Sequence, residues 1–414
     1  MSLNVEVELG VNYVSTSGGR IPFIIRVKSG ETARFRAPLS LAIAIDVSES
    51  MRGHKLEMAK EAAKRAINCL GEKDILSLYA FSGHVEPIAE NVYVTSKEWF
   101  KYHIDMLKIH AFTNLFEALN RAWRAALKSP QNYVRRVLLL TDGQPTVGER
   151  NIEVFSRESG EAFSNGVSIV CYGIGEDYNE NILYTIARSS NGIFRHIDDP
   201  NQIVEHFVYD VSQMLSTIAN NTTLRIIPVQ GVKVAIYGRN YNTVETIAEI
   251  PIGGIEANTA VEVYGELFTP PRIEGVYRLA SIELVYNDII SNTQKILSNI
   301  AEIRTIYTAN SELLSKGVNK TVIDRVLALI KTEEISQAIA RGDTKTLTAK
   351  LEEIGKTVML DPAKTQILKG IGKILDEYSK TRRLDTKEAL YLTMALQQGK
   401  TQVLPERNTK DKSI

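Results

Sequence analysis

Five oxygen-bearing side chains of this sequence could bind a metal ion. Asp46 ends an apolar run and opens the segment DVSESMRG, in which Ser48 and Ser50 follow two and four residues later. A second carboxylate, Asp142, directly follows the run VLLLT, and Thr113 opens a stretch with helical spacing. Carboxylates and hydroxyls are hard ligands that suit Mg²⁺, Mn²⁺ or Ca²⁺, and two carboxylates roughly offset a 2+ charge. The residues therefore predict one divalent cation, with Mg²⁺ preferred.

These side chains need a scaffold that brings them to one place. Between about residues 35 and 218, short apolar runs alternate with amphipathic stretches, which is typical of strands and helices wound around a mostly parallel sheet. Ligands of such sheets bind outside the carboxyl ends of the strands, near the point where the strand order reverses. We expect Asp46 and Asp142 at this edge. The expected strands are Leu39 to Ile45, Ile75 to Phe81, Val137 to Leu140 and Val167 to Ile174.

Two stretches between these runs carry apolar residues at spacings of three and four, which gives each one apolar helical face. This pattern predicts an open, doubly wound α/β domain over residues 35–218. The first face contains Leu56, Ala59, Ala63, Ile67 and Leu70, and the second contains Leu115, Leu119, Ala122 and Ala126.

An Asp, Ser and Ser cluster after a strand can also serve only to cap the next helix. Here, however, the cluster is followed by Met51 and Gly53, and then by the segments FTNL and LLLTDG in this order. Over roughly 180 residues the sequence resembles the von Willebrand factor A (vWA) family with its metal-ion-dependent adhesion site. The resemblance favours the metal site over the cap.

The resemblance also implies a role for each residue. Ser48 and Ser50 correspond to the hydroxyl ligands, Asp46 and Asp142 to carboxylates that act mainly through water, and Thr113 to a ligand that engages in one conformation of the domain. Glu49 stands where the family usually has Gly. This third carboxylate at the mouth of the site could tighten cation binding, occupy the open position or repel an acidic ligand, or it could point outward into solvent.

The flanking regions have other patterns. Residues 1–34 and 219–308 contain alternating strand-like segments, and we expect them to join in one β-sandwich into which the vWA domain is inserted. Residues 309–398 have helical periodicity and predict a helical bundle, with Asp361 and Pro362 at a helix start. Residues 399–414 have too few large apolar residues to pack and predict a flexible tail. The two helical stripes are Val322, Val326, Leu329 and Ile330, and Leu347, Leu351 and Ile354.

This arrangement with a short polar tail resembles archaeal vWA proteins of the archaellum regulatory network. The resemblance implies a forkhead-associated-domain protein and Ser/Thr kinases as partners. In the tail, Thr401 has Leu404 three positions later, a pattern that forkhead-associated domains select when the threonine is phosphorylated. Thr409 and Ser413 are poorer fits. We therefore expect phosphorylation at Thr401.

Composition limits the other functions. Lys plus Arg and Asp plus Glu both number 49, so no charge excess indicates nucleic acid or an anionic membrane as partner. No apolar run approaches the ~20 residues of a membrane span and the first residues do not resemble a secretion signal, so we expect a cytoplasmic protein. Cys69 and Cys171 lack any metal-binding spacing and are expected to be reduced core residues.

No catalytic motif for a phosphate loop, a nucleophile elbow or a zinc hydrolase occurs in the sequence. We therefore expect a binding protein and not an enzyme. Two binding functions remain open. The first is a scaffold with a phosphorylated tail, and the alternative is a substrate adaptor for an AAA-type ATPase.

Overall fold

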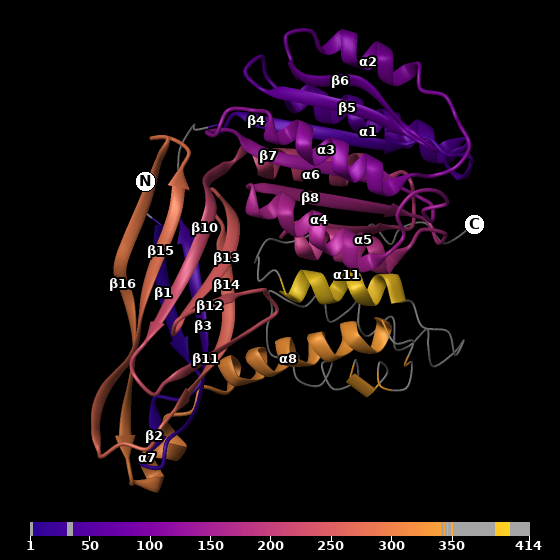
Figure 1. Cartoon of the computed structure of the whole chain (residues 1–414). Helices are drawn as coiled ribbons and strands as arrows, with labels where there is room; N and C mark the ends of the chain where they lie inside the picture. The colour runs from indigo at the N-terminus through magenta and orange to yellow at the C-terminus, as the bar shows by residue number, and fades with distance from the viewer. Residues whose placement is uncertain are drawn as a thin grey trace, which may run out of the picture.

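The computed structural model of the protein describes residues 3–30, 36–340 and 386–397, together with residues 343, 346, 349 and 350. An α/β domain, from strand β4 to helix α6, lies beside an elongated pair of β-sheets (Figure 1). Two C-terminal helices run below the α/β domain. None of the helices in the described ranges is both long and apolar enough to cross a membrane.

The α/β domain is built on a six-stranded sheet of order β6-β5-β4-β7-β8-β9. All neighbouring strands are parallel except β6, which is antiparallel to β5. The chain leaves β4 to form β5 on one side and later returns to form β7 on the other, so the strand order reverses between β4 and β7. The strands are β4 (Leu39–Asp46), β5 (Ile75–Phe81), β6 (Val85–Tyr93), β7 (Val134–Thr141), β8 (Val167–Ile174) and β9 (Ile193–Ile197).

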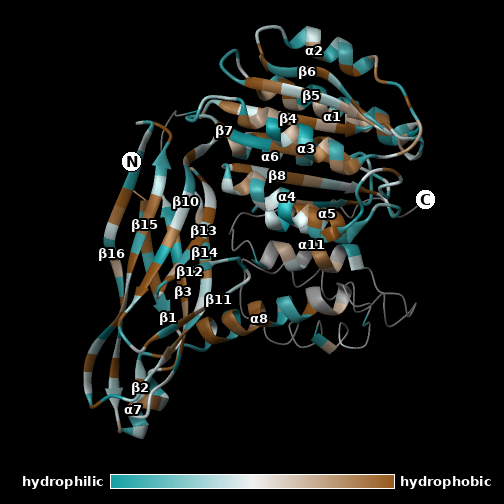
Figure 2. Ribbon diagram, viewed as in Figure 1, coloured by the Kyte–Doolittle hydropathy of each residue, from teal (hydrophilic) through white to brown (hydrophobic). Residues whose placement is uncertain are grey.

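Helices cover both faces of this sheet, because its central strands are apolar on both sides. Ala42 and Ala44 of β4 face one layer of helices, and Leu41 and Ile43 face the other. Figure 2 shows these strands as largely hydrophobic. The first layer holds α3 (Leu115–Leu127), α4 (Ile152–Ser164) and α5 (Glu180–Ser189), and the second holds α1 (His54–Cys69), α2 (Lys97–Asp105) and α6 (Gln202–Leu215). Every apolar residue expected on the two helical faces is buried. The doubly wound α/β fold is confirmed.

Two further sheets enclose a separate core. The first has the order β1-β3-β14-β11 and the second the order β12-β13-β10-β15-β16-β2, so strands from before and after the α/β domain share both sheets. The first contains β1 (Leu3–Leu9), β3 (Gly19–Ser29), β14 (Ala260–Thr269) and β11 (Lys233–Tyr237). The second contains β12 (Asn242–Val244), β13 (Ile247–Glu256), β10 (Thr217–Pro228), β15 (Gly275–Asp288), β16 (Thr293–Thr308) and β2 (Tyr13–Ser15).

The α/β domain is attached to this sandwich by two connections that lie side by side. The backbone N–H of Ala37, just before β4, donates to the carbonyl of Leu215 at the end of α6 over 3.1 Å. Strand β10 then begins at Thr217. The domain is therefore inserted between β3 and β10, and its two ends are hydrogen-bonded to each other.

The C-terminal helices pack on both bodies. Helix α7 (Ser311–Lys316) is short, and α8 (Lys320–Ala340) follows it. The α8 residues Val322, Val326 and Leu329 pack with two residues of the first sandwich sheet. Helix α11 (Thr386–Gln397) contributes to the core on the α5 side of the α/β domain. The first expected helical stripe is thus confirmed as an apolar face, with Ile330 half-buried beside it.

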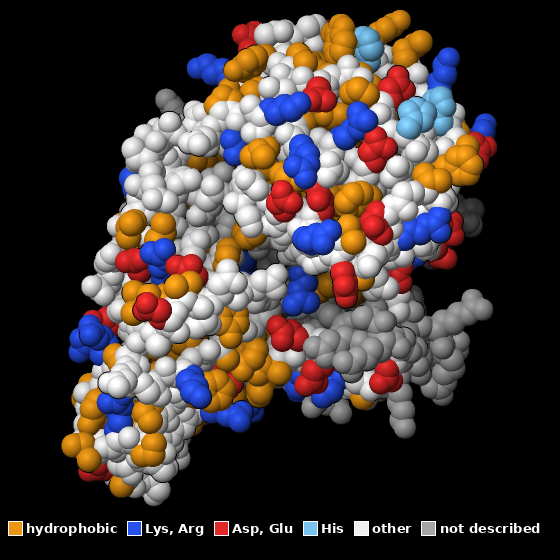
Figure 3. Space-filling view, in the orientation of Figure 1, with side chains coloured by type: hydrophobic (Ala, Val, Ile, Leu, Met, Phe, Trp, Pro, Cys, Tyr) orange, Lys and Arg blue, Asp and Glu red, His pale blue; other side chains and the backbone are white. Residues whose placement is uncertain are grey.

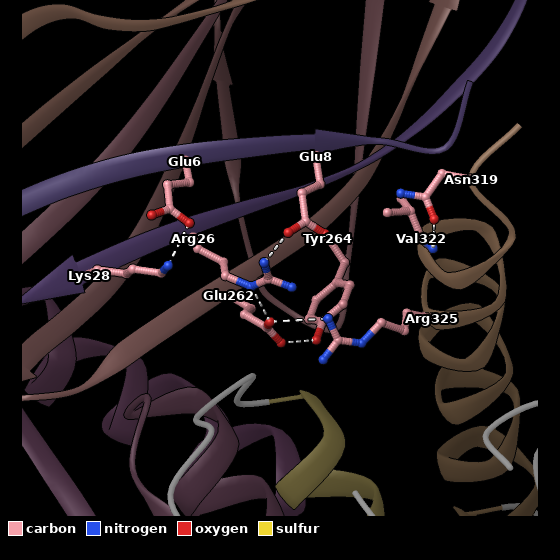
Figure 4. Close-up of polar contacts among 9 residues, drawn as sticks. All are labelled: Glu6, Glu8, Arg26, Lys28, Glu262, Tyr264, Asn319, Val322 and Arg325. Carbon is pink, nitrogen blue, oxygen red and sulfur yellow. Dashed lines mark hydrogen bonds and ion pairs between the residues drawn. The ribbon is translucent and has the colours of Figure 1, made fainter. Parts of the chain in front are cut away.

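A buried charge cluster accompanies the apolar contact of α8 (Figure 4). Glu262 of β14 accepts hydrogen bonds from Arg26 Nε of β3 at 2.7 Å and from Arg325 Nη1 of α8 at 3.3 Å. The Tyr264 hydroxyl also donates to Glu262, and Arg26 pairs with Glu8. The carboxylate therefore ties the helix to the sheet.

Several sequence expectations lie outside the described residues. These are the helix start at Asp361 and Pro362, the second helical stripe and the whole tail with Thr401, Thr409 and Ser413. Of the cysteines, Cys171 is buried in β8 as expected, whereas Cys69 at the end of α1 is only half-buried.

Candidate metal centre

Asp46 is the fixed point of the candidate site. It ends β4 next to the reversal of strand order and is fully buried. Its Oδ1 accepts from the backbone N–H of Ser48 at 2.8 Å, and its Oδ2 accepts from Thr141 Oγ1 at 2.5 Å. Both carboxylate oxygens are therefore held in place by the loop that follows β4 and by the end of β7.

The two serines of the loop lie beside the second carboxylate. Ser48 Oγ and Ser50 Oγ are 3.1 Å apart, and Ser50 Oγ donates to Asp142 Oδ1 at 2.6 Å. Ser48 precedes a short 3₁₀ turn, η1 (Glu49–Met51), but its side chain makes no capping hydrogen bond to it. Helix α1 begins after Gly53 and likewise has no side-chain cap. Hence neither serine serves as a helix cap, and both hydroxyls remain within the polar cluster.

Thr113 reaches the cluster from the loop before α3. Its backbone N–H donates to Thr146 Oγ1 at 2.8 Å, which fixes the loop. Gly143 lies between Thr113 and Ser50: a Cβ added to this glycine would be 3.4 Å from Ser50 Oγ and 3.6 Å from Thr113 Oγ1. Because no side chain fills this cradle, the two hydroxyls face the same small space. The structure thus brings all five sequence-predicted residues together.

Two buried carboxylates make the centre acidic. Burial raises the pKa of the Asp46 carboxyl to about 7, against the hydrogen bonds from Thr141 and Ser48. Asp142 is also fully buried, and its Oδ2 accepts from Lys55 Nζ at 2.5 Å. The cluster thus contains two carboxylates and one ammonium, and additional positive charge at this point would favour the ionised form of Asp46.

The donor set fits a hard divalent cation. It consists of carboxylate and hydroxyl oxygens, which Mg²⁺, Mn²⁺ and Ca²⁺ prefer, and it contains neither imidazole nor thiolate. Within the part of the chain that the structure describes, no three His, Cys, Asp or Glu residues gather into a cluster, so hydroxyl oxygens would have to complete any ligand set here. Asp46, Ser48, Ser50, Thr113 and Asp142 are the residues that could hold the ion.

Glu49 lies at the surface. Its Oε1 is 2.6 Å from Arg52 Nη2, and about two thirds of each side chain is exposed. Of the alternatives left open by the sequence, this position corresponds to the outward carboxylate. His54 is exposed as well and contacts Asn201.

Lys55 and Thr141 were not recognised from the sequence as members of the site. Thr141 is the last residue of β7 and directly precedes Asp142, and this position beside a predicted ligand was the only signal in the sequence. Lys55 carries no such signal, because its contact with Asp142 depends on how α1 lies against the sheet.

The α/β domain resembles known proteins. Residues 40–209 match the family model of the von Willebrand factor type A domain. An uncharacterized protein of Synechocystis sp. is 24% identical over 358 residues, and the match covers 83% of each chain. Inter alpha-trypsin inhibitor, heavy chain 4, of Mus musculus is 29% identical over 226 residues, which are 50% of this chain and 24% of that protein. The chain thus spans about a quarter of the length of this second relative.

Two solved structures share the fold of nearly the whole chain. The von Willebrand factor type A protein from Catenulispora acidiphila superposes with a TM-score of 0.76 at 18% identity, covering 96% of this chain and 97% of that one. The ArnB paralog VWA2 from Sulfolobus acidocaldarius superposes with a TM-score of 0.68 at 20% identity, covering 96% and 98%. The family match and the doubly wound sheet together show that residues 40–209 have the fold of a von Willebrand factor type A domain.

Proposed function

We propose that the protein is a non-enzymatic interaction scaffold that binds partner proteins through one divalent cation, preferably Mg²⁺. The ligands are Asp46, Ser48, Ser50, Thr113 and Asp142. vWA domains typically mediate protein interactions, and residues 40–209 match the vWA family model. We also propose that the protein is located in the cytoplasm.

The single observation that carries the proposal is the hydrogen-bonded cluster at the reversal of strand order. Ser48, Ser50 and Asp142 form a continuous chain of short contacts, and Gly143 leaves the space between Ser50 and Thr113 free of side-chain atoms. A bound cation would supply a Lewis-acidic position for a carboxylate of the partner. The chain's own residues orient the oxygens and exclude water from the buried side of the site.

An exposed apolar residue at the rim of the site favours a protein as the binding partner. Phe112 is adjacent to Thr113, is 61% exposed and has a positive φ of 69°. A bulky residue in this conformation is strained, and such strain is found mostly at functional positions. Figure 3 shows apolar and histidine side chains at this end of the α/β domain. We assign Phe112 as an apolar contact beside the cation.

Truncating both serine hydroxyls tests the metal site. In the Ser48→Ala/Ser50→Ala variant, Mg²⁺ should no longer raise the free energy of unfolding. For the unmodified protein we expect about 2.7 kcal/mol of stabilisation at a free Mg²⁺ concentration one hundred times the dissociation constant. Thermal unfolding of the full chain in Mg²⁺ and in EDTA measures the difference.

Ser212→Ala is the matched control, because Ser212 is an exposed serine of α6 and bonds only its own helix backbone. This control should respond to Mg²⁺ like the unmodified protein. Phe112→Ala should also keep the Mg²⁺ response but capture less partner in a pull-down. Undiminished Mg²⁺ stabilisation of the double serine variant would show that the ion binds elsewhere.

We further propose that phosphorylated Thr401 in the tail is read by a forkhead-associated-domain partner, with Ser/Thr kinases as the modifying enzymes, in the regulation of archaellum expression. Thr409 and Ser413 are secondary positions. The TQVL segment supports this assignment.

A pull-down from native extract with mass spectrometry tests the tail. The full chain should retain the forkhead-associated protein and carry phosphate on Thr401, whereas a chain ending at Gln398 and the Thr401→Ala variant should both lose that partner. Thr409→Ala serves as the control. If the shortened chain retains every partner, the tail proposal is wrong and an adaptor role for an AAA-type ATPase becomes the better function.

A further inference from the structure

A cavity lies far from the proposed metal site, where the α/β domain meets the sandwich. It has a volume of about 420 Å³, within the range of small-molecule pockets. The ends of α4 and α5 form one wall, β10, β13 and the β11–β12 connection form another, and α11 contributes Met394 and Gln397. Figure 3 shows the surface hollowed between the two bodies. Because α4 and α5 end just before β8 and β9 begin, the cavity lies at the amino edge of the sheet.

The cavity is positively charged. Arg188 at the end of α5 and Arg239 in the β11–β12 connection both line it, and no Asp or Glu occurs among its described lining residues. Arg188 is half-buried and forms no ion pair within the described ranges of the chain. Arg239 Nη1 donates to Asn191 Oδ1 at 3.4 Å. Burial lowers the pKa of the Arg239 guanidinium to about 10, and an anion in the cavity would favour its charged form.

Two buried polar atoms of the wall have no hydrogen-bond partner among the described residues. Thr222 Oγ1 of β10 is one, in a residue only 1% exposed. The other is Gln397 Nε2 of α11, whose Oε1 is already bonded by the Tyr184 hydroxyl at 3.1 Å. Buried polar groups are nearly always paired, so each atom indicates a missing partner. Both are donors, as a ligand with acceptor oxygens requires.

We propose that this cavity binds a small phosphate monoester. Two guanidiniums match a group that carries about two negative charges near neutral pH, and arginine binds phosphate oxygens through paired N–H groups. The Thr222 hydroxyl and the Gln397 amide can donate to further oxygens. Phe163 and Tyr241, both half-buried in the wall, can contact the organic part of the ligand.

The location gives the ligand a structural role. Arg188 belongs to the α/β domain, Arg239 to the sandwich and Gln397 to α11, so one ligand contacts all three parts. Because this arrangement exists only in the folded chain, binding stabilises the junction by mass action. The inference does not depend on the proposed cation-mediated function, since the two sites lie at opposite edges of the sheet.

Binding is measured by calorimetry and thermal unfolding with the full chain. The probes are inorganic phosphate, adenosine monophosphate and glucose 6-phosphate, with adenosine and citrate for comparison, in EDTA and at constant ionic strength. EDTA prevents the cation site from contributing. We expect at least one phosphate ester to bind more tightly than inorganic phosphate, and adenosine and citrate not to bind.

Two variants locate the binding. Arg188→Gln and Arg239→Gln should each weaken binding of that ester by roughly tenfold. Arg157→Gln is the matched control, because Arg157 is exposed on α4 and does not line the cavity. Arg188→Gln keeps the test valid if Arg239→Gln fails to fold. The proposal is overturned if none of the phosphates binds at millimolar concentration, if citrate binds instead, or if Arg188→Gln binds like the control.

Discussion

Lys55 occupies an unusual place in the proposed cation site, because its ammonium already pairs with Asp142, one of the two carboxylates. The side chain comes from the first turn of α1, and about a quarter of it is exposed. Asp142, its partner, is fully buried. A divalent ion bound to Asp142 must share this carboxylate with Lys55. If the proposed site binds an ion, we expect Lys55 to stabilise the metal-free protein and to lower the affinity for the ion.

Replacing Lys55 separates these two effects. Lys55→Met should lower the free energy of unfolding in EDTA by about 2 kcal/mol, because the buried carboxylate of Asp142 loses its partner. The expected loss is smaller than for a fully buried ion pair, because Lys55 is partly exposed. The same variant should bind Mg²⁺ more tightly and gain more stability from it. Denaturant unfolding with and without Mg²⁺ measures both the stability of the metal-free variant and the stability that it gains from the ion.

Lys64→Met is the matched control on the same helix. Lys64 pairs at the surface with Asp105, so its loss should cost less than about 1 kcal/mol and leave the Mg²⁺ response unchanged. Weaker Mg²⁺ binding by Lys55→Met would instead make the lysine part of the binding site.

At the scale of elements, the hairpin of β15 and β16 depends on one buried carboxylate. Asp288 Oδ1 accepts from the backbone N–H groups of Ile290 at 2.9 Å and Ser291 at 3.2 Å, and Oδ2 pairs with Lys295. Burial acts to raise the pKa of Asp288, but the hydrogen bonds from Lys295 and from the turn hold the pKa below its ordinary value. The ionised carboxylate therefore stabilises the folded chain.

The lowered pKa of Asp288 determines how the stability of the protein changes with pH. A lowered folded pKa gives stability that is present above the unfolded pKa of about 4 and is lost as the pH falls through the folded value. Asp288→Asn should be less stable than the unmodified protein by about 1 kcal/mol at pH 7, and this difference should vanish near pH 2. Denaturant unfolding across this range measures it.

Asp105→Asn, which alters an exposed carboxylate, provides the comparison and should show a smaller difference at every pH. A difference for Asp288→Asn that persists unchanged in acid would mean that the charge of this residue contributes nothing to the hairpin.

At the scale of the whole molecule, α8 connects the two bodies. One side of the helix packs on the sandwich through Val322, Val326 and Leu329, whereas Ile335 and Ala338 join the core that contains α11 and the α5 side of the vWA domain. At the sandwich end of α8, Glu262 lies between Arg26 and Arg325 and accepts a hydrogen bond from each. Loss of the Glu262 carboxylate should therefore lower the free energy of unfolding more than loss of an ordinary surface ion pair.

Two carboxylates of the same sheet allow a matched comparison (Figure 4). Glu262→Gln leaves two largely buried guanidiniums without their shared charge and should lower the free energy of unfolding by about 3 kcal/mol. Glu6→Gln removes an exposed pair with Lys28 and should cost less than about 1 kcal/mol. Equal effects in denaturant unfolding would show that the buried cluster has no special role.

Local sequence patterns predicted much of the fold and the residues of the candidate site. The spacing of Asp46, Ser48 and Ser50 is set within one loop, and helical periodicity revealed the apolar face of α8. Contacts between distant segments could not be predicted: Lys55 meets Asp142 across 87 positions, and Arg188 and Arg239 share a cavity only because the two bodies pack together. The direction of Glu49 depended on a rotamer and a neighbouring arginine, which periodicity does not encode.

The adjacent connections of the vWA domain have a mechanical consequence. Because the Ala37 N–H donates to the Leu215 carbonyl, the two covalent connections of the domain leave the sandwich at one spot, so tension along the sandwich strands would pass from β3 to β10 without stretching the domain. Under load, α11 and α8 would peel away first and the sandwich strands would separate next. Only then would force reach the strands that carry the proposed cation ligands, so this edge of the sheet would keep its shape while the rest of the molecule was being pulled apart.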